Sequence, residues 1–161
     1  MKGEEGVTHA RPAAAELVYA EDMHVGQRVE LGSYEVTDAD LVEFASAWDP
    51  QWFHVDSEAA EQGQFGGLIA SGIHTLAILT RLTFEAVGYR WAMIAGRGFK
   101  ELRFPRPVRP GDVLTGEVVL SDIAFDDRER ALVTTQSTLV EQHGRPVLTV
   151  QLEAYVHARP Q

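Results

Sequence analysis

The sequence contains no cysteine among its 161 residues, and this absence excludes several kinds of chemistry at once. Disulfide bonds, thiolate catalysis and cysteine-based metal sites all need a residue that the chain lacks. The sequence also has no apolar run of about 18 residues, so we expect no membrane-spanning helix. Residues 1–20 lack the continuous apolar core of a secretory signal. We therefore expect a cytoplasmic protein.

Positive charge is scarce, because 14 Lys and Arg residues face 24 Asp and Glu residues and leave a net charge of −10. General binding of nucleic acid needs a basic surface, so this composition argues against it. Five of the positive side chains nevertheless lie between Arg97 and Arg109, with Glu101 as the one acid among them. This basic stretch has two interpretations. It is either a solvated strand face or a binding site for a phosphate-bearing ligand. In the second case Arg97, Lys100 and Arg103 would contact the phosphate.

The length and the 45% hydrophobic content fit one domain with a core of its own. Residues 1–20 carry no hydrophobic period, so we expect a flexible N-terminal arm followed by a single domain over residues 21–161. Thr37 and Asp40 form a capping-box pattern that predicts a helix starting at residue 38. Pro50 disfavours the helical conformation for Asp49, so this helix should end at or before Asp49.

Further along the chain, the pattern predicts one strand over residues 29–36, with Gly32 as a bulge, and a short helix over residues 57–63. A helix over residues 72–87 is apolar nearly all round, apart from a stripe of His74, Arg81 and Glu85, which is typical of a buried helix. Four extended segments follow, at residues 91–104, 113–123, 131–140 and 148–156. This order predicts an α+β fold with a helix packed on an antiparallel sheet.

The segment FASAWDPQWFHVD, residues 44–56, places Asp49 and His54 among Trp48, Trp52 and Phe53. An acid and a histidine five residues apart are, by themselves, more often a structural pair than a catalytic one. Aromatic side chains exclude water, however, and such lining is typical of small-molecule pockets. Gly72 lies at the start of the helix over residues 72–87, where backbone N–H groups lack helical partners and can stabilise an oxyanion.

These residues resemble the MaoC-like dehydratases and (R)-specific enoyl-CoA hydratases of the hotdog-fold superfamily. Their motif reads roughly FA-x-x-x-G-D-x-N-P-I-H-x-D, and their glycine follows the catalytic histidine by eighteen residues, as Gly72 follows His54. The segment PRPVRPGD, residues 105–112, also resembles a turn of that family. The chain departs from the motif at Trp48, Gln51 and Trp52, which replace glycine, asparagine and proline.

The resemblance implies a hotdog fold, an antiparallel sheet wrapped around a central buried helix. It implies that Asp49 and His54 activate a water for reversible hydration of a trans-2-enoyl-CoA to an (R)-3-hydroxyacyl-CoA, with Gly72 N–H as the oxyanion donor. No metal or redox cofactor is implied, and the protein is expected to be a homodimer or a larger homo-oligomer. Two alternatives remain open at this point: an acyl-CoA thioesterase, and a non-catalytic acyl-CoA-binding or assembly protein.

Three polar residues at the start of the same helix have two interpretations each. Ser71, His74 and Thr75 either make ordinary structural hydrogen bonds or help to shape the substrate pocket around Gly72. A metal site is not expected, because no helix carries two histidines four residues apart.

Overall fold

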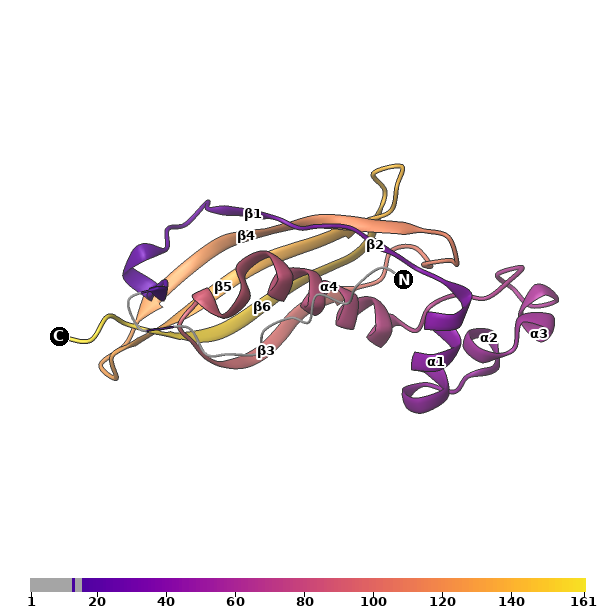
Figure 1. Ribbon diagram of the computed structural model, residues 1–161, viewed down its shortest axis with the longest axis horizontal. Coiled ribbons are helices and arrows are strands. Elements are labelled where there is room, and N and C mark those ends of the chain that lie inside the picture. Colours follow the sequence, from indigo (N-terminus) through magenta and orange to yellow (C-terminus); the bar gives the residue numbers. More distant parts are fainter. Residues whose placement is uncertain (1–12, 14–15) are drawn as a thin grey trace.

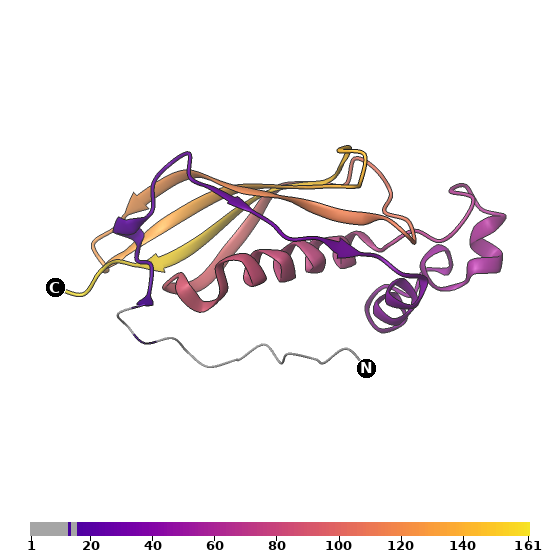
Figure 2. The same cartoon turned by 45° about the horizontal axis from the view of Figure 1, so that its top comes forward.

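The computed structural model describes residue 13 and residues 16–161. An antiparallel sheet curves over one long helix, α4 (Gly72–Val87), which lies along its concave side (Figures 1 and 2). The predicted α+β architecture with a helix on an antiparallel sheet is confirmed. The strands are β1 (Arg28–Glu30), β2 (Tyr34–Glu35), β3 (Met93–Arg103), β4 (Val113–Phe125), β5 (Arg130–Val140) and β6 (Pro146–His157).

The strands are arranged in the order β1-β4-β5-β6-β3, and β2 pairs with β4 beyond the end of β1. All four long strands appear where the sequence predicted extended segments, with ends that differ by a few residues. The strand predicted over residues 29–36 is divided, because Leu31 to Ser33 stand opposite only Thr115 and Gly116 of β4. One extra residue on one strand is the defining feature of a bulge. Gly32 lies in this bulge, as its position in the sequence predicted.

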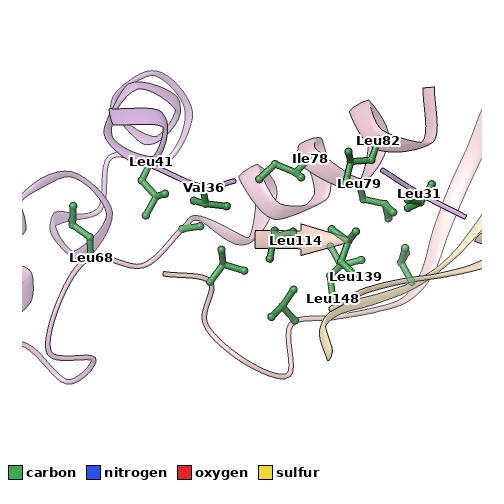
Figure 3. Packing of buried hydrophobic residues seen from close by; sticks show 14 of the residues in the cluster. Leu31, Val36, Leu41, Leu68, Ile78, Leu79, Leu82, Leu114, Leu139 and Leu148 are labelled. Atoms are coloured by element: carbon green, nitrogen blue, oxygen red, sulfur yellow. The ribbon is translucent and has the colours of Figure 1, made fainter. Parts of the chain in front are cut away.

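The core lies between α4 and the sheet. Ile78, Leu79 and Leu82 of α4 face Leu114, Leu139 and Leu148 of the sheet in one buried cluster (Figure 3). The polar stripe predicted on this helix is only partly correct. Arg81 is exposed, whereas His74 is buried and the apolar Ile73 is exposed. The helix therefore has a solvent-facing side. In its first turn the hydrophobic period predicted the wrong residues for that side, because Ile73 rather than His74 is exposed.

Three short helices gather beyond the N-terminal end of α4: α1 (Asp38–Trp48), α2 (Trp52–Val55) and α3 (Ser57–Glu61), as Figures 1 and 2 show. The capping box at the start of α1 is confirmed, because Asp40 N–H donates to Thr37 Oγ1 over 3.2 Å and the Asp40 carboxylate accepts from Thr37 N–H. The helix ends at Trp48, as Pro50 predicted. The single turn of α2 was not predicted.

Residues 1–12 and 14–15 of the predicted N-terminal arm lie outside the described residues. Val18 forms a parallel bridge with Trp91, and the side chains of Tyr19 and Ala20 are buried. Packed structure therefore begins before residue 21. In the described part of the chain, no helix is both long enough and apolar enough to cross a membrane.

Candidate active site

Asp49 is the residue at which the chain leaves α1. Its backbone adopts φ −154° and ψ 69°, outside the helical region, which agrees with the restriction that Pro50 imposes. Its carboxylate accepts two hydrogen bonds, from Ser71 Oγ at 2.7 Å and from Gln51 Nε2 at 2.9 Å. These donors, Ser71 foremost, hold the pKa of Asp49 below its ordinary value, so the carboxylate is charged at neutral pH.

His54 lies in the single turn of α2 and is 4% exposed. Its Nδ1 is 2.7 Å from the carbonyl oxygen of Ile69. A carbonyl oxygen can only accept a hydrogen bond, so Nδ1 carries the proton. In the neutral imidazole, Nε2 is then left with a lone pair. The sequence offered no sign of this backbone partner.

The two side chains meet through Nε2 of His54 and Oδ2 of Asp49, which are 3.5 Å apart. With the histidine neutral, both atoms are hydrogen-bond acceptors, so neither can donate to the other. A water molecule carries two donor hydrogens and could satisfy both acceptors at once. The predicted pair is thus brought together by the fold, and its geometry suits the activation of one water.

A cleft of about 380 Å³ opens beside His54. It is lined by His54 and Gly72, by the apolar side chains of Phe65, Ile69 and Phe104, and by Thr75 and Arg106 among others. Gly72 is the first residue of α4, so its N–H has no hydrogen-bond acceptor within the helix. A side chain at this position would meet the ring of Phe104 at 2.8 Å, so glycine here makes room for that ring.

The aromatic residues of the motif do not all enclose the pair. Trp48 is 74% exposed and Trp52 is 51% exposed, so neither shields Asp49 and His54 as the sequence suggested. The ring of Trp52 instead packs where a side chain on Gly63 would stand. Phe53 is the aromatic neighbour of His54, at 4.4 Å between ring centroids. Of the three aromatic residues, Phe53 is therefore the one whose ring packs against the imidazole.

Among the polar residues at the start of α4, the structure separates three roles. Ser71 contacts Asp49, and Thr75 lines the cleft. His74 does not line it. Its ring is buried and stacks on Phe44 of α1 at 4.5 Å, and burial lowers its pKa. Nδ1 of His74 has no hydrogen-bond partner among the described residues.

The basic stretch is mostly occupied by ion pairs on the sheet. Lys100 Nζ lies 2.7 Å from Glu153, Arg97 lies 3.8 Å from the same carboxylate, and Arg103 pairs with Glu101. None of these three cations lines the cleft at Gly72. The cation that does is Arg106, which the sequence placed in the same stretch without singling it out. In the described part of the chain, no three His, Asp or Glu side chains gather closely enough to hold a metal ion.

A second, more apolar cavity of about 260 Å³ runs between α4 and the sheet. On the helix it extends from Leu76, the residue after Thr75, to Gly88. On the sheet it is lined by the inward-facing side chains of β4, β5, β6 and β3, among them Val118, Val133, Thr135, Val150 and Ala154. The cleft at His54 and this cavity thus border neighbouring residues of α4, Thr75 and Leu76.

The antiparallel sheet curved around the long helix α4 is a hotdog fold. The family model described as MaoC like domain matches residues 21–142. The chain belongs to the MaoC-like dehydratase family.

The relatives support this assignment over most of the chain. The 3-hydroxyacyl-thioester dehydratase Z of Mycobacterium tuberculosis is 35% identical, over 82% of this chain and 86% of that protein. Nodulation protein N of Rhizobium meliloti is 34% identical, over 84% and 88%. The crystal structure of a MaoC-like dehydratase from Rhodospirillum rubrum superposes with a TM-score of 0.81 at 39% identity, over 89% of this chain and 99% of that one.

The protonation of His54 can be tested without any substrate. We expect nitrogen NMR of the neutral form of His54 to show the proton on Nδ1 and a bare Nε2, because Ile69 O accepts from Nδ1. His143, which is exposed in the β5–β6 hairpin, serves as the comparison within the same sample. A proton on Nε2 of neutral His54 would contradict the arrangement.

Proposed function

We propose that the protein catalyses the reversible hydration of a trans-2-enoyl thioester, with an enoyl-CoA as substrate and an (R)-3-hydroxyacyl-CoA as product. The observation that carries this proposal is the 3.5 Å separation of two acceptors, His54 Nε2 and Asp49 Oδ2, of which His54 lines the cleft. Such a pair can hold one water by both of its hydrogens and aim its oxygen at the β-carbon of the alkene.

The chemistry then follows from the charges at the site. As the water oxygen bonds to the β-carbon, one of its protons passes to the acceptor pair, and the C=C electrons move toward the thioester carbonyl. The imidazolium formed at His54 is stabilised by the Asp49 carboxylate on one side and the Ile69 carbonyl on the other. The same proton is next given to the α-carbon. Addition from one side places the hydrogen and the hydroxyl on the same face.

The negative charge on the thioester oxygen needs a donor while the α-carbon is unprotonated. Gly72 N–H is suited to this role, because it lies at the positive end of α4 and lines the cleft with His54. Loss of one such donor costs roughly 10²- to 10³-fold in rate in other enzymes. Gly72 is thus assigned as the oxyanion donor.

The two cavities suggest how the rest of the substrate binds. The apolar cavity that begins at Leu76 would accept the acyl chain, since hydrocarbon is favoured in a water-poor space. Arg106 in the cleft is the cation placed to meet an anionic part of the carrier, such as a phosphate. Arg97, Lys100 and Arg103 would first have to leave their carboxylate partners to contribute.

The direct test is an absorbance assay with crotonyl-CoA and a series of longer trans-2-enoyl-CoA thioesters. We expect the parent protein to consume the enoyl chromophore reversibly. Asp49→Asn and His54→Ala should each slow the reaction by about 10²-fold or more, because the first removes the carboxylate charge and the second removes the imidazole acceptor. Asp127→Asn and His143→Ala make the same chemical changes in exposed hairpins and should react like the parent.

Three outcomes would overturn the proposal. Asp49→Asn and His54→Ala variants that react at the parental rate would show that the pair does not act. Release of free thiol without loss of the enoyl group would favour a thioesterase. Binding of the whole series without turnover would favour an acyl-binding protein.

We also propose that the protein is a homodimer or a larger homo-oligomer that pairs through β3. This strand is at the edge of the sheet, and every residue from Met93 to Arg103 is exposed. Exposed edge strands are usually covered, because their free N–H and C=O groups favour pairing. The large apolar side chains exposed here and just beyond include Met93, Ile94, Phe99, Leu102 and Phe104.

Light scattering at micromolar concentration tests this second proposal. We expect a mass of at least two chains, and we expect Phe99→Asp to lower it because the charge would be buried at the pairing edge. Phe125→Asp is the matched control, since Phe125 is exposed to a similar degree at the end of β4. A parent protein with the mass of one chain would contradict the proposal.

A further inference from the structure

The hydroxyl of Ser71 has an unusual hydrogen-bond partner for a residue at the start of a helix. Ser71 occupies the N-cap position of α4, where a serine side chain ordinarily accepts a hydrogen bond from the backbone of the first turn. Here the side chain makes no such cap bond. Its Oγ instead donates to Oδ2 of Asp49 at 2.7 Å, across a sequence separation of 22 residues. The residue is 1% exposed, so water does not compete for this bond.

We propose that Ser71 is a positioning residue that ties the Asp49 carboxylate to the start of α4, so that the acid and the Gly72 N–H keep a fixed relation. This inference rests on the proposed function, because it assigns Ser71 a part in the same reaction. Ser71 touches no reacting atom in this account. It acts through Asp49.

The need for such a donor follows from where Asp49 stands. Its backbone caps the C-terminal end of α1, where helix carbonyls disfavour a negative charge. In the described part of the chain, no lysine or arginine forms an ion pair with this carboxylate. Its charge is held by Ser71 and by the exposed Gln51, which binds the other oxygen. Ser71 is therefore the protected donor of the two.

The choice of oxygen also matters. Ser71 binds Oδ2, the same atom that lies 3.5 Å from His54 Nε2. A carboxylate oxygen has two lone pairs, so Oδ2 can accept from Ser71 and still accept from a water. With the Ser71 bond in place, the free lone pair has a defined direction.

A four-residue segment thereby orients the whole site. Ile69 O accepts from His54, Ser71 Oγ donates to Asp49, and Gly72 presents its N–H. The segment is itself held by backbone bonds, from Ala70 N–H to Val108 O at 2.8 Å and from Ile69 N–H to Phe53 O at 3.2 Å. A shift of this segment would move all three groups together, which keeps their spacing constant.

The test compares Ser71→Ala with Ser71→Thr, which keeps the hydroxyl, and with Ser121→Ala. Ser121 donates one hydroxyl bond to Thr134 O on the sheet, so its variant controls for the loss of a serine hydrogen bond elsewhere. Carbon NMR titration of the Asp49 carboxyl should show a higher pKa in Ser71→Ala, because the main donor to the charged form is gone. Ser71→Thr and Ser121→Ala should leave this pKa near the parental value.

Activity on the best enoyl-CoA gives the second readout. We expect Ser71→Ala to lower kcat by roughly 10- to 100-fold with little change in KM, since the acid is misplaced while the binding surfaces remain. Ser71→Thr should recover most of this loss. An unchanged Asp49 pKa together with an unchanged kcat in Ser71→Ala would overturn the inference.

The two proposals can fail separately. If the parent protein hydrates no enoyl thioester, the proposed function fails, whereas the carboxyl titration still decides whether Ser71 holds Asp49. If Ser71→Ala does not fold, the carboxyl titration is made with Ser71→Cys instead. A thiol has a similar size and is only a weak hydrogen-bond donor, so the pKa of Asp49 should again be higher than in the parent. An Asp49 pKa in Ser71→Cys equal to that of the parent would then contradict the inference.

Discussion

The hydrogen bond from His54 Nδ1 to the carbonyl oxygen of Ile69 is the interaction on which the rest of the site depends. It fixes the proton on one ring nitrogen and leaves the other as an acceptor. Without it, Nε2 could donate to Asp49, and the two side chains would satisfy each other. With it, two acceptors 3.5 Å apart require a donor from outside, and a water has the right number of hydrogens.

The site residues come from three different helices, whose ends the fold brings close together. Asp49 lies where α1 ends, His54 lies in the turn of α2, and Gly72 lies where α4 begins (Figure 1). At the start of α4 the backbone N–H groups lack helical partners, so the Gly72 N–H is available for binding and catalysis. The sheet contributes the long core contact with α4, which keeps the helix start in place (Figure 3).

Local signals in the sequence predicted much of this. The capping box at Thr37, the restriction by Pro50 and the alternation along the last strands all act over a few residues, so helix and strand positions were predictable. The partners of Ser71 and Lys100 were not, because they depend on how distant segments meet: Ser71 reaches Asp49 22 residues away, and Lys100 reaches Glu153 53 residues away. The outward orientation of Trp48 likewise depends on which side of α1 faces the body of the protein.

The central claim is that one water, held by two acceptors on one side of the alkene, supplies both the hydroxyl and the hydrogen. The stereochemistry of hydration in heavy water tests it most directly. Crotonyl-CoA is hydrated in D₂O, and proton NMR of the product gives the relative configuration at C2 and C3. We predict a single diastereomer with the deuterium and the hydroxyl added to the same face. Anti addition, or deuterium scrambled over both positions at C2, would contradict the account.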